Sequence, residues 1–518
     1  MANKTLFQSL LGAILPQTDA VNAAGGKAYA LMPKPALAQY AATGCLNGTF
    51  YAGADEQLET VLTLAQAVEP EFLAKVAIHA RESGNMKDMP ALLLAVLAVR
   101  DVQLLKRVFA RVCDNGKMVR TFVQILRSGV AGRKSLGTAP KKLVRAWMEQ
   151  LPDARLLAAT VGNDPSFADL VKMVHPKPQD AARRAFYAWL IGREHDASAL
   201  PAPVQVFEAW KQDRSLPVPD VPFQLLTSAP LDAAAWCAIA RQSSWQATRM
   251  NLNTFVRHGV FKVEGMAELV AARLRDEVAI RKARVFPYQL MVAYQQAEKD
   301  VPAQVREALQ DAMEIAIANV PAFEVPVAVC PDVSGSMQSP VTGNRGTATT
   351  SVRCRDVAAL MAATIVRCNP RSEVLPFSDR VNEVRLNPRD SVMTNAKLLA
   401  ELPSGGTDCS LPVAELNRRK AKAGLVILVS DNESWIDGNP HARGTALLRE
   451  WQVFRARNPG AKLVCLDLQP NRSVQAPDRE DILNIGGFAD EVFATIAAFA
   501  AGRLSADHWV GVIEQTGL

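Results

Sequence analysis

The fold of this chain is decided by residues 325–337, which read VPVAVCPDVSGSM. An apolar run, Val325–Cys330, leads directly into a polar segment that holds Asp332, Ser334 and Ser336. The proline in this run is tolerated because it stands near the start of the predicted strand, where a missing N–H disturbs little pairing. A buried strand that ends in a polar loop is typical of an α/β sheet, in which binding residues follow the carboxyl ends of the strands.

Further strand-like runs follow in the same part of the chain, and stretches with helical periodicity separate them. The predicted strands are Glu373–Phe377, Gly424–Val429 and Lys462–Leu468. The predicted helices are Val352–Cys368, Leu411–Ala421 and Ala442–Arg457. Continuously apolar strands that alternate with helices indicate a doubly wound parallel sheet covered on both faces.

The first 320 residues differ, because they read as helix after helix with no convincing alternating strand. Val102–Cys113 (VQLLKRVFARVC) shows the pattern, with apolar residues three and four positions apart. We found no fixed repeat length, so the pattern predicts an irregular α-solenoid. A chain of 518 residues is too long for one ordinary core. We therefore predict an α-helical domain over 1–320, an α/β domain over 321–505 and a C-terminal tail over 506–518.

Composition excludes several classes of protein. Apolar residues make up 49% of the chain and charged residues 21%, which argues against wholesale disorder. The longest apolar run, Ala91–Val99, has half the length of a bilayer span, so we expect no membrane association. Eight cysteines without a CxxC pair exclude a disulfide scaffold and a cysteine zinc site. Unpaired thiols, and a start (residues 1–15) that resembles a helix more than a signal peptide, predict a cytoplasmic protein.

Positive charge is concentrated in one segment. The net charge is +6, but residues 101–150 alone hold 11 basic and 3 acidic side chains, a local charge of +8. No acidic residue occurs between Asn115 and Met148. Such a segment attracts polyanions, although a merely solvated face remains the alternative. The basic residues of this segment are Lys117, Arg120, Arg127, Arg133, Lys134, Lys141, Lys142 and Arg145.

The polar residues at the predicted strand ends form a candidate metal site. Asp332, Ser334 and Ser336 follow the first strand, Thr407 lies in the loop before a helix, and Asp431 follows a later strand. All five side chains offer oxygen, which is what Mg²⁺ requires. Hydroxyl ligands add no negative charge, so the metal would stay electrophilic toward an anionic partner. The alternative is that the two aspartates only cap turns.

The DxSxS pattern with a later Thr and Asp resembles the metal-ion-dependent adhesion site of von Willebrand factor A domains, and the resemblance extends over residues 322–505. The flanking sequences GGTDCSLP (Gly405–Pro412) and SDNESW (Ser430–Trp435) resemble the Ro ribonucleoprotein autoantigen family and its bacterial relatives, the TROVE-module proteins. In the front half GCLNGTFY (Gly44–Tyr51), FPYQL (Phe286–Leu290) and HPKP (His175–Pro178) are similar to motifs of that family.

This resemblance implies a closed ring of HEAT-like helical repeats whose two ends are bridged by the A domain. It implies that small noncoding Y-like RNA binds the basic outer face and that single-stranded 3′ ends of misfolded or unprocessed RNA enter the hole. It also favours an RNA contact for His175, extended by Lys172 and Lys177. Without the resemblance, a lone histidine before a proline is more often a structural turn residue.

We therefore expect a non-catalytic RNA-binding scaffold that presents RNA to another factor, such as an exoribonuclease. A single chain that closes the ring implies a monomer, which RNA could join into larger assemblies. A second hypothesis is a Mg²⁺-dependent module that grips an acidic protein partner, with RNA binding secondary. A metal-dependent nuclease is the weakest hypothesis, because two-metal hydrolysis needs several bridging carboxylates.

Overall fold

The computed structural model describes residues 15–44, 46–228, 230–283, 285, 287–297, 299–317, 320–344, 352–436, 441–504 and 507–518. The chain divides into two compact units. The sheet unit comprises the residues up to Val68, residues 285–292 and residues 313–517. The helical unit comprises residues 69–284 and 293–312. The predicted helix at the N-terminal end, as well as Cys45 and Phe286 of the two motifs named above, lie outside the described residues.

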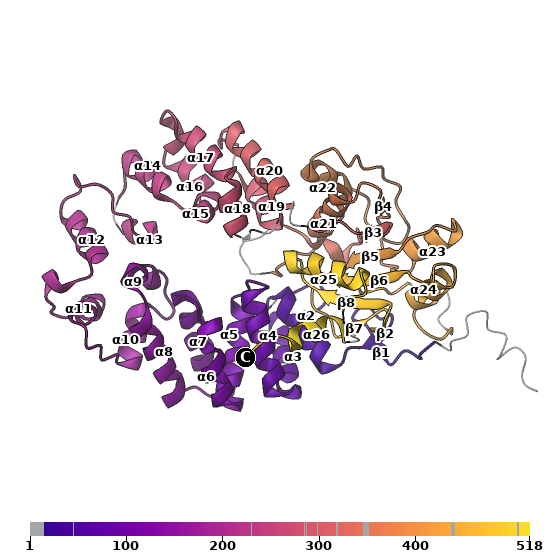
Figure 1. Cartoon of the computed structure of the whole chain (residues 1–518), viewed down its shortest axis with the longest axis horizontal. Coiled ribbons are helices and arrows are strands. Elements are labelled where there is room, and N and C mark those ends of the chain that lie inside the picture. The colour runs from indigo at the N-terminus through magenta and orange to yellow at the C-terminus, as the bar shows by residue number, and fades with distance from the viewer. Residues whose placement is uncertain are drawn as a thin grey trace, which may run out of the picture. The chain divides into compact units, whose positions relative to one another are not determined.

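The helical unit is built from short helices in sequence order (Figure 1), as the apolar periodicity predicts. The most apolar of them, α5, is buried over nearly its whole length and packs against α4, α6 and α7. Local signals set the helix ends: the Asp101 carboxylate accepts from two backbone N–H groups at the start of α6, and Ser166 forms a capping box with Asp169 at α10. The helices are α4 (Pro70–Glu82), α5 (Asp88–Arg100), α6 (Val102–Val112), α7 (Gly116–Ser128), α8 (Thr138–Gln150), α9 (Asp153–Thr160), α10 (Phe167–Val174), α11 (Ala181–Leu190), α12 (Ala202–Gln212), α13 (Phe223–Leu226), α14 (Ala233–Gln242), α15 (Trp245–Met250), α16 (Leu252–Arg257), α17 (Met266–Leu274) and α18 (Glu277–Ala283). Two further helices, α19 (Pro287–Gln296) and α20 (Ala303–Ile317), contribute residues to both units.

The sheet unit contains the predicted parallel sheet, with strand order β4-β3-β5-β6-β8. All four neighbouring pairs are parallel, which confirms the doubly wound α/β architecture. The strands are β3 (Val327–Pro331), β4 (Glu373–Val374), β5 (Leu425–Ser430), β6 (Lys462–Asp467) and β8 (Ile482–Gly486). The helices are α21 (Cys354–Cys368), α22 (Val392–Ala400), α23 (Leu411–Arg418), α24 (Ala446–Arg457), α25 (Asp490–Ala500) and α26 (His508–Glu514).

The sheet is buried on both faces. Trp451 and Phe454 of α24 pack with Val413 and Leu416 of α23 onto one face, where Leu428 is one of the strand residues in the same core. Helix α21 packs against β3 and β5, and α22 packs against α21. Because neither face meets water, every residue of β3 and β5 is buried, which explains why these strands read as continuous apolar runs.

Residues 15–68 also belong to the sheet unit, and they include two strands where the sequence pattern indicated none. The strands β1 (Ala20–Val21) and β2 (Lys27–Ala30) pair antiparallel, and β2 pairs with β7 (Ser473–Val474). Helix α2 (Pro33–Thr43) packs against β8, and α3 (Ala54–Ala67) follows it. Within the predicted tail, α26 packs against α2 and β8. None of the helices in the described part of the chain combines the length and hydropathy needed to cross a membrane.

Candidate metal centre and basic surface

The structure brings the predicted metal ligands to the carboxyl end of β3 and β5. Asp332 directly follows β3, and its backbone N–H donates to the carbonyl of Val429 in β5. The Ser334 N–H donates to Asp332 Oδ1 at 2.7 Å, and the hydroxyl oxygens of Ser334 and Ser336 lie 3.3 Å apart. Asp431 follows β5 and is 2% exposed. These backbone and side-chain contacts place two carboxylates and two hydroxyls around one point.

The fifth predicted ligand, Thr407, is held by the same set of loops. The Gly335 N–H donates to the Gly405 carbonyl at 3.0 Å, which joins the loop after β3 to the loop before α23. The Thr407 carbonyl accepts from the backbone N–H of Trp435, in the loop after β5. Thr407 is 3% exposed. Its loop is therefore fixed to both of the other ligand-bearing loops.

Burial makes the two carboxylates costly unless a cation joins them. Burial, with the nearby Asp431 as a second cause, raises the pKa of Asp332 to about 7. Burial also raises the pKa of Asp431. The Oδ2 atom of Asp431 is buried and has no hydrogen-bond partner among the described residues. An all-oxygen donor set with an unsatisfied carboxylate oxygen fits a hard divalent cation. Elsewhere in the described residues, no group of three or more His, Cys, Asp or Glu side chains could hold a metal ion.

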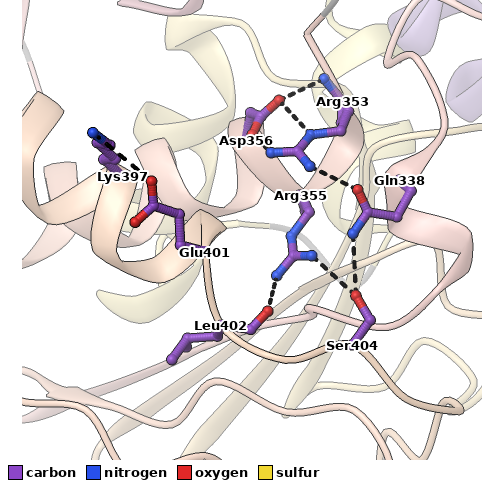
Figure 2. Close-up of polar contacts among 8 residues, drawn as sticks. All are labelled: Gln338, Arg353, Arg355, Asp356, Lys397, Glu401, Leu402 and Ser404. Carbon is purple, nitrogen blue, oxygen red and sulfur yellow. Dashed lines mark hydrogen bonds and ion pairs between the residues drawn. The ribbon is translucent and has the colours of Figure 1, made fainter.

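Two arginines of α21 and its N-terminus brace the loops that carry the ligands (Figure 2). The buried Arg355 guanidinium donates to the Leu402 carbonyl at 2.6 Å and to the Ser404 hydroxyl at 3.0 Å. Arg353 pairs with Asp356 and donates to the Gln338 side chain at 2.7 Å. Gln338 in turn donates to Ser404. This network was missed in the sequence, because nothing in a local pattern marks which loop an arginine will reach.

The N-terminal segment reaches the same site, which the sequence analysis also missed. The Ser336 hydroxyl hydrogen-bonds to Tyr51, and burial together with Asp431 raises the pKa of the Tyr51 phenol. Glu433 is 2% exposed and accepts from the Ala24 N–H, and burial raises its pKa to about 7. The only available signal was the GTFY motif, to which no role was assigned.

Eight of the predicted RNA-binding residues are fully exposed side chains of the helical unit. We call this set the basic surface. Helices α7 and α8 each pack against α10, so the side chains come from neighbouring elements. Contacts join these helices near the end of α10: Arg127 of α7 contacts Met173, and Arg145 of α8 donates to the Val174 carbonyl. The basic surface consists of Lys117, Arg127, Lys134, Lys141, Lys142, Lys172, His175 and Lys177.

The other three predicted residues use their charge within the protein. Arg120 is 6% exposed and donates to the backbone carbonyls of Ala159 and Val161, at 2.6 and 2.5 Å. We therefore leave Arg120 out of the basic surface. Arg133 and Arg145 are half-buried, and each donates to a backbone carbonyl, of Ser135 and Val174 respectively.

His175 combines both readings that its sequence left open. It ends α10 in the left-handed conformation, with φ 50° and ψ 63°, and its N–H donates to the Val171 carbonyl. This conformation terminates a helix, so the residue has a structural role in the turn. Its imidazole is exposed and remains available to a ligand.

Comparison with known proteins agrees with this architecture. Residues 163–322 match the family model of the TROVE domain, and residues 326–500 match that of the Ro60 vWA domain. The chain is 25% identical to the RNA-binding protein RO60 of Deinococcus radiodurans, over 97% of this chain and all of that protein. It is 24% identical to the RNA-binding protein RO60 of Caenorhabditis elegans, over 46% of this chain and 38% of that protein.

A solved structure supports the same fold. The crystal structure of the Ro (Rsr) protein of Deinococcus radiodurans matches with a TM-score of 0.63 and 22% identity, covering 91% of this chain and all of that chain. A TROVE domain is thus followed in one chain by a Ro60-type vWA domain, and the similarity to a Ro60 protein runs over nearly the full length. The chain belongs to the Ro family of RNA-binding proteins.

Proposed function

We propose that this protein is a non-catalytic RNA-binding scaffold of the cytoplasm. The observation that carries the proposal is the basic surface, where eight exposed cationic or imidazole side chains come from neighbouring elements around α7, α8 and α10. Lys and Arg contacts to phosphate supply affinity without reading base sequence, because each contact releases condensed counterions. A structured small RNA of the Y-like class is the ligand we propose for this surface.

We further propose that single-stranded 3′ ends of misfolded or unprocessed RNA are bound as well, and that the scaffold presents them to an exoribonuclease. Single strands differ from duplexes in shape and in exposed bases, so a helical scaffold can select them without catalysis. In this proposal the protein is a monomer, and RNA joins copies into larger assemblies. What supports these finer steps is the family membership.

Asp332, Ser334, Ser336, Thr407 and Asp431 would hold Mg²⁺ or another divalent cation. Bound there, the cation would supply an electrophilic position for an anionic oxygen of a partner. The chain's own contribution is to position the ligands: Ser430 and the Ser334 N–H orient the Asp332 carboxylate, and Arg355 fixes the loop before Thr407. With hydroxyls dominating the set, the site lacks the bridging carboxylates of a two-metal nuclease, which supports a non-catalytic role.

The decisive experiment is charge reversal on the basic surface. We expect the triple variant Lys134→Glu, Lys141→Glu, Lys142→Glu to bind small structured RNA about tenfold more weakly or worse, with the salt dependence reduced by about one log unit per lost phosphate contact. The matched control reverses three exposed lysines elsewhere, at Lys262, Lys397 and Lys422. Equal RNA affinity for the parent and the surface variant would reject the proposal.

The second candidate function is a Mg²⁺-dependent protein-interaction module, favoured by the buried Asp431 oxygen that lacks a partner among the described residues. In that case Asp332→Ala should abolish Mg²⁺-dependent capture of an acidic peptide and leave RNA affinity unchanged. Loss of RNA binding in Asp332→Ala, with an intact fold, would count against two independent sites.

A further inference from the structure

A polar cavity of about 350 Å³ opens in the sheet unit beside the candidate metal centre. Its walls come from the β1 turn, from α2 and α3, from residues 49–52, and from the loops after β5 and β6. Tyr51 and Glu433 line it, and Tyr51 also contacts the metal-site residue Ser336. The cavity therefore lies over the carboxyl ends of β5 and β6, where ligands of open α/β sheets bind. Its volume is in the range of small-molecule sites.

One wall of the cavity offers a fixed cation. Arg472 is exposed, and its guanidinium donates to the hydroxyl of Thr60 and hydrogen-bonds to that of Tyr40. The Thr60 hydroxyl donates onward to the Glu56 carbonyl at 2.8 Å. The Arg472 backbone is held too, because its carbonyl accepts from the Leu31 N–H at 2.9 Å. A guanidinium carries five N–H donors in a planar fork, which matches the oxygens of a phosphate group.

A second wall offers aromatic rings. Phe50 is 59% exposed, which is unusual for so large an apolar side chain, and its ring packs edge-on against Tyr51 with centroids 4.8 Å apart. Tyr51 is held in place by its hydrogen bond to Ser336. Exposed, pre-positioned aromatic rings are the platforms on which unpaired nucleobases stack.

The remaining charges limit what the cavity can hold. Glu433 and Glu56 also line it, so one guanidinium stands against two carboxylic side chains. A ligand with several phosphates would meet uncompensated negative charge, whereas a single phosphate at Arg472 would not. Carboxylate oxygens accept hydrogen bonds, which suits the amino and imino groups of a base.

We propose that this cavity binds one nucleotide of a single-stranded RNA, with the base stacked on the Phe50–Tyr51 pair and the phosphate held by Arg472. The inference rests on the proposed RNA-binding function and assigns to the sheet unit a nucleotide contact in addition to the basic surface. The ligand chemistry is a nucleoside monophosphate unit, whether free or at the end of a strand.

The test is calorimetric titration of the full chain with the four nucleoside 5′-monophosphates and with the corresponding nucleosides. We expect saturable binding of at least one monophosphate, and binding about tenfold weaker or worse in Arg472→Gln because a charged hydrogen-bonded pair is lost. Nucleoside binding should stay within about twofold, since the deleted contact is to phosphate. Phe50→Ala should weaken nucleotide and nucleoside alike, by about fivefold or more.

The matched control is Arg385→Gln, which removes an exposed arginine of the same unit away from the cavity and should bind nucleotides like the parent. Arg472→Lys keeps the charge without the fork and should fall between parent and Arg472→Gln. Thermal unfolding of each variant verifies folding, and Arg472→Lys keeps the test decisive if Arg472→Gln is unstable.

Two outcomes would overturn the inference: no saturable binding of any monophosphate, or equal binding by the parent and both Arg472 variants. Competition by a short single-stranded oligonucleotide separates the two sources of the nucleotide, because a strand-end site is emptied by it and a site for free nucleotides is not. If the parent binds structured RNA while no monophosphate binds, only this inference fails. If the parent binds no RNA at all, the proposed function fails first.

Discussion

Ser430, the last residue of β5, donates a 2.6 Å hydrogen bond to Oδ2 of Asp332, at the end of β3. The residue that precedes one candidate metal ligand therefore holds the carboxylate of another. Both side chains are buried, and the same Ser430 oxygen accepts from the backbone N–H of Asn432. Adjacent parallel strands thus orient the ligand set before any cation binds.

Ser430→Ala should weaken divalent-cation binding and lower the free energy of unfolding by about 1–3 kcal/mol, because a buried carboxylate loses a donor. The measurement is the rise in unfolding temperature on adding Mg²⁺, which should be smaller in the variant than in the parent. The control is Ser372→Ala, since the Ser372 hydroxyl has no hydrogen-bond partner among the described residues. An unchanged Mg²⁺ response in Ser430→Ala would contradict the assigned role.

Acid should destabilise the protein through His79, which is 9% exposed in α4. Burial lowers the pKa of His79 to about 4 in the folded state. The unfolded chain, with an ordinary histidine pKa near 6.5, binds the proton first, so this contribution is fully present above about pH 6.5 and is lost as the pH falls toward 4. The loss amounts to about 3 kcal/mol at most.

The measurement for His79 is the free energy of unfolding against pH, compared between the parent and His79→Gln. The variant should lose this part of the pH dependence, because glutamine does not titrate. His195→Gln removes an exposed histidine instead and should keep the parental slope. A steep slope retained in His79→Gln would assign the acid sensitivity to other groups.

Gly26→Ala should loosen the β1–β2 hairpin from the metal loop. A Cβ at position 26 would lie 2.1 Å from the Ser434 carbonyl oxygen, a contact that only a backbone shift can relieve. We expect a loss of about 1–3 kcal/mol in unfolding free energy, together with weaker Mg²⁺ stabilisation. Gly460→Ala is the control, because an added Cβ there meets nothing within 4 Å. If both substitutions behave alike, the hairpin does not support the loop.

Arg120 and Lys117 lie on the same helix and should separate stability from RNA binding. Arg120→Gln should lower the free energy of unfolding by about 2 kcal/mol or more, because two backbone carbonyls lose a charged donor. Lys117→Gln should leave stability unchanged and weaken RNA binding, with a shallower salt dependence. Chemical denaturation and salt-titrated RNA binding measure the two effects, and an exchange of the two phenotypes would refute the assignment.

Much of this protein follows from its sequence alone, because the signals are local. The apolar run Val325–Cys330 becomes β3, Gly424–Val429 becomes β5, and the polar residues after them meet at one sheet edge, as the rule for parallel strands requires. The helical periodicity of the front half and the exposed lysines of α8 are also local properties. Burial and chain geometry leave these segments few other solutions.

Only the tertiary structure decided which distant segments meet. The β1–β2 hairpin joins β7, Asn22 donates to the Ser434 carbonyl across 412 residues, and Tyr51 reaches the metal site. It also buried Arg120, whose sequence neighbours in the basic run are exposed. The physical reason is that periodicity records only whether a position faces a core or water. The particular partner depends on packing between segments that share no local pattern.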